Sequence, residues 1–410
     1  MRVKPGGSLW RPATSLVVGL MLASVNAPSS LAQKSYGPGV SDTEIKIGQT
    51  MPYSGPASSY GTLGRASAAY YRMVNEQGGI NGRRITFISL DDGYSPPKTV
   101  EQARRLVEQE GVLAIFGSLG TPTNIAIQRY LNEHKVPQLF AWSGAARFRD
   151  PQNYPWSMGG DLSFIHETAA FAAFVLKTVP NAKIAVLYQN DDYGRDHLAG
   201  LRQGLGADAT RMIVKLATYE STDATIDSQV IELSASGADV LLTIAIPKFT
   251  AQAIRKIYEI GWKPMHFIAY PAASIPTTLQ PAGLEKSVGV ISAEFIKQPG
   301  DPAWANDPEM MEYLAFMKKY DADADPNDKL AVLGYYQAAA VVQLLKECGD
   351  DLTRENLMHH ATHLQQFHAP MLLPGITLTT TPSDYAAIKQ MRLQRFDGRQ
   401  WVPIGGVVGE

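Results

Sequence analysis

Ser143 is the residue whose surroundings come nearest to those of a catalytic nucleophile. It lies in Ala141-Trp142-Ser143-Gly144-Ala145, which has the serine of the G-x-S-x-G hydrolase turn but neither of the two glycines that this strained turn needs. We therefore interpret Ser143 as a hydrogen-bond donor at the end of a strand. An exported α/β hydrolase stays as a minor alternative, to be tested by loss of turnover in Ser143→Ala.

Other enzyme signatures are absent. The chain contains no G-x-G-x-x-G, no G-x-x-x-x-G-K-[ST] and no H-E-x-x-H, which argues against a nicotinamide dehydrogenase, a P-loop NTPase and a zinc protease of that type. The sequence predicts that the protein is not an enzyme and needs no cofactor.

Histidines cluster near the C-terminus, where a metal site deserves consideration. His359 and His363 are four residues apart, a spacing that places both on one helical face and can hold zinc. No carboxylate follows at a matching spacing, so solvated or locally hydrogen-bonded histidines are favoured over a metal. The acidic stretch Asp321–Asp328 lacks the central glycine and terminal glutamate of a calcium loop.

A larger group of candidates is made of hydroxyls and aromatic rings that follow apolar strands. In Val112–Asn124 an apolar run stops at Gly117 and continues into hydroxyls, glycine and proline. Parallel α/β sheets bind ligands at such strand ends, where N–H groups of the next helix point outward and favour an anion. These candidates are Tyr53, Ser54, Tyr60, Tyr94, Ser118, Thr121, Trp142, Ser143, Tyr188, Asp191, Tyr193 and Tyr270. Together they predict a mostly apolar cavity for a small organic carboxylate.

Alternating elements must position these residues. Apolar residues at strand and helix spacing predict a first series of strands at 45–50, 84–90, 112–116 and 137–141 with helices at 62–77, 97–109 and 123–134. A second series follows, with strands at 183–188, 211–217, 239–244 and 266–269 and helices at 164–179, 195–205, 225–236 and 249–260. Such alternation predicts two doubly wound parallel sheets.

The rest of the chain is less regular. We expect strands at 288–295, 375–379 and 392–396 and helices at 308–320 and 331–348. A tail of this length must pack on one lobe or both, and we expect it to cross back, so that several strands connect the lobes and act as a hinge.

Composition narrows the function further. A net charge of -2, from 37 basic and 39 acidic residues, offers no basic face for a nucleic acid. At the N-terminus, Arg2, Lys4 and Arg11 precede the short apolar run Ser15–Ala23, the order found in a secretory signal, with cleavage expected after Ala32. Cys348 is the only cysteine, so no internal disulfide can form, and we expect its thiol to be buried.

Several segments of the sequence, taken together, resemble those of a known family. The segments Ile45–Gly48, Pro52–Pro56, Tyr60-Gly61, Asn75–Gly82, Asp91-Asp92 and Gly117–Thr123 are similar to those of the leucine/isoleucine/valine-binding type of periplasmic receptor for ABC transporters. The resemblance implies a type I periplasmic-binding fold, in which two lobes joined by a three-strand hinge close on a ligand without chemistry. Together with the signal peptide at 1–32, the expected domains are lobe 1 at 42–158 plus 291–375 and lobe 2 at 159–290 plus 376–410.

The resemblance also implies site residues. Thr121 matches a hydroxyl that holds the ligand's carboxylate, Trp142 and Gly144 lie in the loop that completes that site, and Tyr60 matches a tyrosine over the ligand. The candidate ligand-binding residues are Tyr60, Ser118, Thr121, Trp142, Ser143, Gly144, Asp191, Tyr193, Pro247 and Tyr270.

Two departures from the family concern the second lobe and one the first. An aromatic residue of the family is replaced near Ile246-Pro247, and the acid that pairs with a ligand's ammonium falls near Tyr270-Pro271, where no carboxylate is present. The family's early disulfide is missing, with Tyr94 and Gly120 in its place. Asp191 is the candidate substitute for the missing acid.

The predicted function is that of a periplasmic solute receptor working with a membrane permease. Its expected ligand is a hydrophobic or aromatic acid, with a branched-chain amino acid as the close second. A ligand-sensing receptor that signals to a partner remains an alternative. No nucleic acid, no metal and no membrane insertion after signal cleavage are expected.

Overall fold

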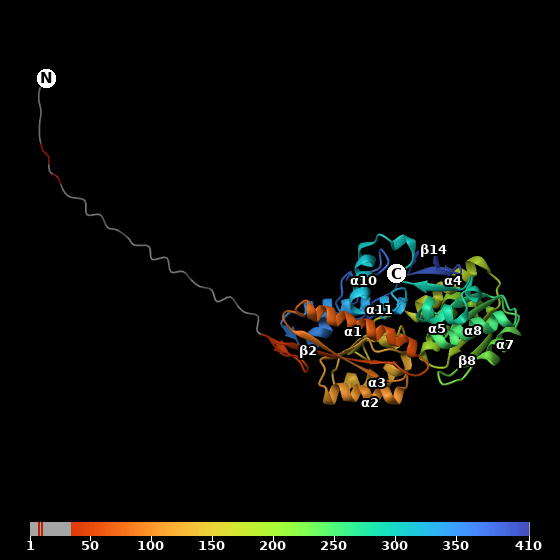
Figure 1. Ribbon diagram of the computed structural model, residues 1–410, viewed down its shortest axis with the longest axis horizontal. Helices are drawn as coiled ribbons and strands as arrows, with labels where there is room; N and C mark the ends of the chain where they lie inside the picture. The colour runs from red at the N-terminus through yellow and green to blue at the C-terminus, as the bar shows by residue number, and fades with distance from the viewer. Residues whose placement is uncertain (1–6, 9, 11–33, 410) are drawn as a thin grey trace, which may run out of the picture. The chain divides into compact units, whose positions relative to one another are not determined.

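The computed structural model describes residues 7, 8, 10 and 34–409. The expected cleavage site after Ala32 and the apolar run of the predicted signal lie outside the described residues. The chain from Lys34 onward forms one compact unit, in which two sheets, each covered by helices, form two lobes (Figure 1).

The first lobe is built on a parallel sheet with strand order β3-β2-β4-β5-β6. Its strands are β2 (Glu44–Met51), β3 (Arg84–Asp91), β4 (Ala114–Phe116), β5 (Gln138–Ala141) and β6 (Ser157–Gly159). The helices that connect them are α1 (Gly61–Glu76), α2 (Pro96–Arg104) and α3 (Thr121–Glu133). This series confirms the predicted order of strands and helices, with β6 added.

The second lobe is built on a sheet with strand order β14-β13-β11-β10-β9-β7-β8. Its strands are β7 (Ile184–Gln189), β8 (Ile213–Tyr219), β9 (Val240–Ile244), β10 (Met265–Ile268), β11 (Ile291–Glu294), β13 (Met391–Phe396) and β14 (Trp401–Val408). Its main helices are α4 (Phe164–Thr178), α5 (Asp192–Leu205), α7 (Asp227–Ser234) and α8 (Pro247–Glu259), with short α6 (Ala209–Met212) and α9 (Gln280–Ala282).

The second sheet is parallel from β11 to β8, as predicted, and has at its edge an antiparallel pairing that the sequence did not predict. β13 runs antiparallel to both β11 and β14. The hairpin is formed by two consecutive strands, which need no helical crossover and therefore pair antiparallel. β11 pairs with β10 and so belongs to this sheet. The four residues of β11 lie just after position 290, where the first segment of lobe 2 was expected to end. The strand expected at 375–379 is absent: that segment contributes only an isolated bridge between Phe367 and Leu378.

Three helices of the C-terminal part return to the first lobe. They are α10 (Pro308–Tyr320), α11 (Lys329–Glu347) and α12 (Arg354–Ala361), beside a two-strand pair of β1 (Ser35–Tyr36) and β12 (Asp351–Leu352). α11 lies along α1 (Figure 1). The helices can pack this closely because Gly334 lacks a side chain: a Cβ there would lie 2.4 Å from the Leu63 carbonyl oxygen.

The chain passes between the lobes three times. One crossing follows β6 and pairs at Leu162 with Ile388 on the last crossing, and another follows β11 and pairs at Ile296 with Leu372. These bridges hold the crossings side by side behind the cavity. They agree with the predicted three-strand hinge.

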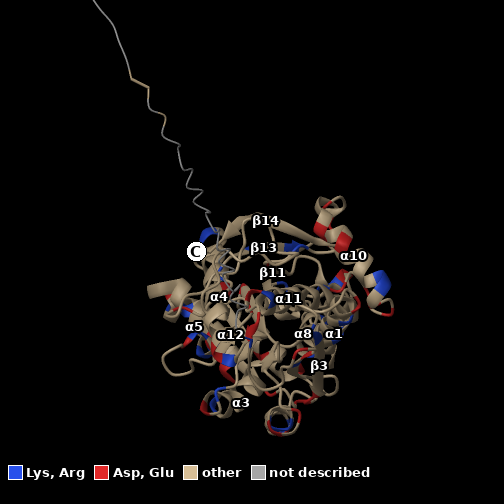
Figure 2. Cartoon of the chain, turned by 90° about the vertical axis from the view of Figure 1, so that its left-hand side faces the viewer, with Lys and Arg blue, Asp and Glu red and all other residues tan. Residues whose placement is uncertain are grey.

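Charged side chains are spread over the surface of both lobes. In Figure 2 basic and acidic segments alternate around the helices, with both signs present on α10. None of the described helices is long and apolar enough to pass through a membrane.

Candidate functional site

A cavity of about 40 Å³ lies where the two lobes meet, several times the ~10–15 Å³ that one water needs. Its walls are mostly aromatic and aliphatic. The lining residues are Tyr60, Leu63, Tyr94, Leu119, Gly120, Thr121, Trp142, Asp161, Phe164, Tyr193, Ile246, Tyr270, Pro271, Leu330 and Leu333. A ligand much larger than a few waters can enter only if the lobes separate.

The first lobe presents the N-terminus of α3 to this cavity. Gly120 and Thr121 both line it, and no side chain caps the helix. Gly120 has a φ of 101°, and a Cβ there would lie 2.6 Å from both Thr123 Oγ1 and the Tyr94 ring. Glycine is therefore required for the backbone to approach the cavity. The N–H groups of the first turn that the helix itself leaves unpaired favour a negatively charged ligand group.

Two hydroxyls join the ends of β4 and β5. The Oγ atoms of Thr121 and Ser143 are hydrogen-bonded at 2.8 Å, and both side chains are buried. Thr121 lines the cavity while Ser143 lies behind it. The pair fixes the Thr121 hydroxyl beside the helix N-terminus.

Trp142 contributes an unused donor. Its ring lines the cavity and is 5% exposed, yet its indole Nε1–H has no hydrogen-bond partner among the described residues. A buried donor without a partner costs free energy, roughly 1–3 kcal/mol. A ligand oxygen would relieve this cost.

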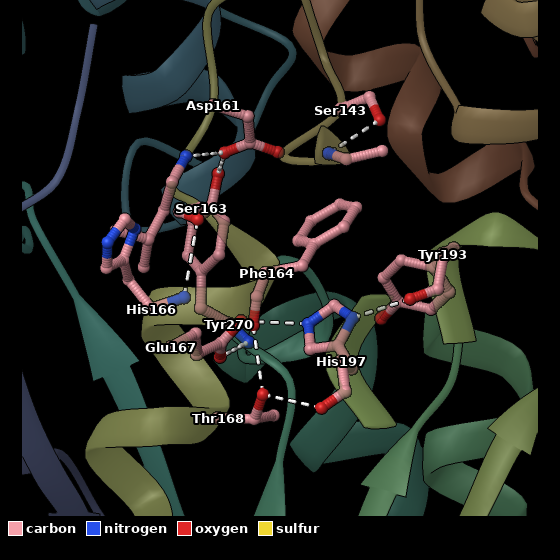
Figure 3. A network of polar contacts seen from close by, with 12 residues as sticks. Ser143, Asp161, Ser163, Phe164, His166, Glu167, Thr168, Tyr193, His197 and Tyr270 are labelled. Carbon is pink, nitrogen blue, oxygen red and sulfur yellow. Dashed lines mark hydrogen bonds and ion pairs between the residues drawn. The ribbon is translucent and has the colours of Figure 1, made fainter. Parts of the chain in front are cut away.

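Asp161 brings a carboxyl group to the same cavity. It lies on the first crossing, where its Oδ1 accepts hydrogen bonds from the Tyr270 hydroxyl and the Leu162 N–H. Burial raises the pKa of Asp161 to about 7, although these two hydrogen bonds act in the opposite direction. Figure 3 shows the second oxygen, Oδ2, pointing away from Tyr270.

A buried polar network holds the second-lobe wall. Glu167 accepts a 2.6 Å hydrogen bond from the Tyr270 N–H and contacts His197 Nε2 at 3.1 Å. The other ring nitrogen of His197 lies 2.8 Å from the Tyr193 carbonyl. Because Tyr193 and Tyr270 both line the cavity, this network sets the relative positions of two wall residues (Figure 3).

An ion pair lies behind Tyr270. Lys329 at the start of α11 contacts Glu294 of β11 at 2.7 Å, and both side chains are 1% exposed. Lys329 also donates to the Tyr270 carbonyl at 3.0 Å. The pair therefore joins a first-lobe helix to the second sheet.

Further hydrogen bonds cross the cleft between the lobes. The Ala146 N–H donates to Asp196 of α5 at 2.7 Å, and Gln189 of β7 donates to the Tyr94 hydroxyl at 3.2 Å. Tyr94 has a φ of 60°, a conformation that is unusual for a large residue and is found mainly where the surroundings enforce it. The structure is therefore a closed conformation of the two lobes.

Comparison with known proteins now identifies the family. The family model described as periplasmic binding protein matches residues 44–400. The chain belongs to the periplasmic binding protein family. The resemblance predicted from the sequence is thereby confirmed.

Relatives of this binding protein agree with that assignment. The Leu/Ile/Val-binding protein homolog 7 of Brucella abortus is 23% identical over 78% of this chain and 81% of its own length. A branched chain amino acid ABC transporter protein from Thermus thermophilus, solved with bound valine, superposes with a TM-score of 0.81 at 17% identity, covering 90% of this chain and 98% of that one.

A second solved structure is named for a different ligand. The fatty acid ABC transporter substrate-binding protein from Thermomonospora curvata superposes with a TM-score of 0.76 at 24% identity, covering 92% of this chain and 95% of that one. At such identities the solved structures show the shared fold. The family and fold are those of substrate-binding proteins.

The structure brings five of the candidate binding residues together. Tyr60, Thr121, Trp142, Tyr193 and Tyr270 all line the cavity of this binding protein. Burial raises the pKa of Tyr60, Tyr193 and Tyr270 well above that of free tyrosine. These phenols therefore face a ligand as neutral groups.

The other five candidates are not among the lining residues. The Ser118 hydroxyl accepts from the Thr50 N–H at 2.9 Å, and Ser143 bonds to Thr121. A Cβ on Gly144 would lie 1.8 Å from the Leu162 carbonyl oxygen, so this glycine makes room for the first crossing. Asp191 caps α5 by accepting from the Tyr193 and Gly194 N–H groups. Pro247 begins α8 beside the lining residue Ile246.

Several cavity residues were not expected from the sequence. They are Leu63, Asp161, Phe164, Leu330 and Leu333. The leucines have no local signal beyond helix periodicity, and Asp161 follows two glycines, a pattern typical of an ordinary turn. The role of Asp161 in the cavity becomes visible only through its long-range hydrogen bond with Tyr270.

The histidine pair lies away from this cavity, at the end of α12. The rings of His359 and His363 are 4.2 Å apart, and His363 Nδ1 bonds to the His359 carbonyl at 2.7 Å. Within the described part of the chain no group of three or more His, Cys, Asp or Glu residues could hold a metal ion. The Cys348 thiol is buried, and burial raises its pKa to about 12.

Proposed function

We propose that the protein is the solute receptor of an ABC importer, exported to the periplasm after removal of residues 1–32. It binds a small carboxylate-bearing molecule with a largely apolar body between its lobes and delivers it to a membrane permease. The ligand is a hydrophobic or aromatic acid or a branched-chain amino acid. Binding proceeds by closure and involves no chemistry.

One observation carries this proposal. The cavity combines an uncapped helix N-terminus with an unpartnered indole N–H in a wall that is mostly aromatic and aliphatic. Neutral donors of this kind hold a carboxylate without a basic partner. The apolar walls come from both lobes, so only a closed receptor surrounds the ligand.

We propose that two rigid bodies move relative to each other and that they correspond closely to the predicted lobes. One body is 42–158 with 291–375, and the other is 159–290 with 376–410. The four residues of β11 would move with the second lobe, because β11 pairs with β10 and β13. The three crossings would bend to open the cleft.

Thermal unfolding with a panel of carboxylic acids and amino acids tests the proposal. A true ligand at 100 times its dissociation constant should stabilise the protein by roughly 2.7 kcal/mol. X-ray scattering should show that the same ligand shifts the solution population toward the compact form.

A pair of variants separates the cavity from the surface. Leu333→Phe fills part of the cavity and should abolish the ligand-induced stabilisation, whereas Met311→Ala, which changes an exposed side chain of α10, should retain it. A panel in which no acid or amino acid stabilises the wild type contradicts the proposal.

A further inference from the structure

A second, smaller cavity shares no lining residue with the one where the lobes meet. It measures about 20 Å³, against the ~10–15 Å³ that one water needs. Its lining combines charged and amide side chains with one aromatic ring and an isoleucine. The lining residues are Ile275, Gln298, Pro299, Asp301, Arg392, Gln394, Gln400 and Trp401.

The parts of the chain on both sides of a hinge crossing contribute to this cavity. Residues 298–301 supply one wall and follow the crossing that leaves β11. They are held to the first lobe through the neighbouring Lys297, whose Nζ pairs with Asp307 and Glu309 at the start of α10, at 2.8 and 2.9 Å. The other lining residues belong to the second lobe. The cavity therefore lies across the hinge, and bending of the crossings would change its shape.

Two side chains of β13 offer donors to this cavity. Arg392 and Gln394 are two positions apart, so both lie on one face of the strand. Arg392 Nε and Gln394 Nε2 are buried and have no hydrogen-bond partner among the described residues, and Gln394 is only 2% exposed. On the neighbouring strand β11 (Figure 2), Ser292 lies opposite Gln394, and its buried hydroxyl also lacks a partner among them. Buried donors in folded proteins are almost always hydrogen-bonded, so this face is suited to an acceptor from outside the chain.

The acid nearest in register does not serve Arg392. Glu294 lies directly opposite Arg392 in the pairing of β11 with β13. Its Oε2 accepts from Gln298 at 2.6 Å and pairs with Lys329 at 2.7 Å, while Oε1 accepts from backbone N–H groups of the crossing. This carboxylate is therefore engaged by other donors, which leaves the guanidinium of Arg392 to pair with an anion from solution.

Asp301 and Trp401 limit which anion the cavity can take. One oxygen of Asp301 accepts from the Ala303 N–H at 2.9 Å, and its charge balances that of Arg392, so a doubly charged ligand would meet no further cation in the lining. Trp401 gives its indole N–H to the Ala273 carbonyl at 3.0 Å and offers only the apolar surface of its ring. A flat wall and a small volume favour a small planar ion with a single charge.

We propose that this cavity is a second ligand site, which binds a small, planar, singly charged oxoanion beside Arg392 and Gln394 and stabilises the closed arrangement of the lobes. A ligand shifts a conformational equilibrium by its difference in affinity for the two states, and this anion contacts parts of both lobes as they lie in the closed form. A small carboxylate such as formate and an inorganic ion such as nitrate share this chemistry. The effect on closure rests on the proposed function, whereas the anion site does not.

Thermal unfolding at constant ionic strength tests the anion site. Sodium nitrate or sodium formate replaces sodium chloride in steps, and sodium sulfate is the doubly charged comparison. Because salts also act on the whole protein surface, the quantity compared is the difference in melting temperature between wild type and variant in the same salt. At ten times its dissociation constant a bound anion should raise the melting temperature by about 2 °C. The ion with the larger difference identifies an organic or an inorganic source, and sulfate should give none.

Variants of β13 assign the effect to the two donors. Arg392→Gln and Gln394→Leu should each abolish the rise in melting temperature. Arg395→Gln, which changes an exposed arginine of the same strand, should retain it. Gln394→Leu removes a buried amide group that has no partner, so the variant is expected to fold and keeps the test valid if Arg392→Gln does not.

Two further variants distinguish this site from the interlobe cavity and from a general effect of salt. Leu333→Phe fills part of the interlobe cavity and should leave the nitrate effect unchanged. Asp301→Asn removes a like charge and keeps an oxygen for the Ala303 N–H, so it should tighten nitrate binding by on the order of tenfold.

X-ray scattering without any other ligand tests the effect on closure. Nitrate or formate should lower the radius of gyration of the wild type and of Arg395→Gln, and should leave that of Arg392→Gln unchanged. A radius that stays constant in a salt that stabilises the wild type through Arg392 would overturn the link to closure.

The outcomes separate this inference from the proposed function. Equal melting temperatures of the wild type and both donor variants in nitrate and in formate overturn the anion site and leave the receptor function standing. An effect that disappears in Leu333→Phe also overturns it, because the anion would then act in the interlobe cavity. If no acid or amino acid of the panel stabilises the protein while the Arg392-dependent effect is present, the proposed function fails and the anion site stands.

Discussion

The first-lobe edge of the cavity is built from neutral groups, whereas the crossings and the second lobe around it are built from buried charges. At the first-lobe edge, Thr121 and Ser143 satisfy each other and the α3 N-terminus supplies N–H groups. On the other side, Asp161, Glu167 and Glu294 are all buried, and Lys329 reaches Glu294 from the first-lobe helix α11. Neutral groups can be satisfied by neighbours in the chain, but buried charges need partners that the fold brings from far away.

The difference also separates two tasks. In the proposed function the neutral edge would hold the ligand's carboxylate, because helix N–H groups recognise negative charge and little else. The charged side is where closing the lobes is stabilised. Four changes test this division.

The largest effect is expected from breaking the ion pair behind Tyr270. Lys329→Met leaves Glu294 buried without its cation, which should lower the free energy of unfolding by about 3–5 kcal/mol. Urea denaturation measures the loss. Lys318→Met, an exposed change on α10, is the control and should lie within about 0.5 kcal/mol of wild type; a similar loss in both variants would contradict the importance of burial.

A change at Asp161 should have the opposite sign and depend on pH. The native state retains this proton up to about pH 7, while the unfolded chain releases it near pH 4, so the free energy of unfolding falls as the pH rises from about 4 to 7. Asp161→Asn cannot ionise and avoids that fall. Without ligand it should be more stable than wild type at pH 8, by on the order of 4 kcal/mol, and similar at pH 4.

The measurement is the melting temperature of both proteins between pH 4 and pH 8. Curves that stay parallel across this range would mean that Asp161 is ionised throughout, contrary to its buried position.

The hydrogen bond between Thr121 and Ser143 should contribute less to the free energy of unfolding. Thr121→Val and Ser143→Ala each remove one hydroxyl of a single buried hydrogen bond, so each should cost about 1 kcal/mol. Because both remove the same interaction, the double variant should cost less than the sum. Strict additivity in a double-mutant cycle, measured by urea unfolding, would mean that the two hydroxyls act separately.

The smallest effect on stability is expected at Trp142. Its indole N–H has no partner among the described residues, so Trp142→Phe removes a buried polar group that the fold does not use. The free energy gained by removing this unpaired donor partly offsets the free energy lost with the smaller buried apolar area. The free energy of unfolding should change by about 1 kcal/mol or less. Affinity for a carboxylate should still drop, as calorimetry would show; unchanged affinity would mean that the indole does not contact the ligand.

The neutral edge was accessible from the sequence because it is local. Strand periodicity up to Phe116, followed by glycine and hydroxyls, places Thr121 at a helix N-terminus, and the same reasoning places Trp142 after β5. Alternating strands and helices likewise predict both lobes. The hairpin was harder: Pro403, Gly405 and Gly406 are unusual within a strand, so β14 gave no pattern.

The charged side could not be predicted because its contacts are non-local. The family resemblance puts the acid that pairs with a ligand's ammonium near Tyr270, where this chain has no carboxylate. The candidate substitute, Asp191, caps α5 in the structure. In the structure the Tyr270 hydroxyl meets Asp161 from a segment 109 positions earlier. Glu167 reads as a solvated helix residue until Tyr270 and His197 are packed against it.

The single buried cysteine has a practical consequence. Since Cys348 is the only thiol in the chain and is held protonated by burial, maleimide dyes will spare it in the folded protein. Ala146 is exposed at the lip of the cleft, where its N–H reaches Asp196. A cysteine placed there would carry a fluorophore whose emission reports opening and closing, turning the receptor into a reagentless sensor for its own cargo.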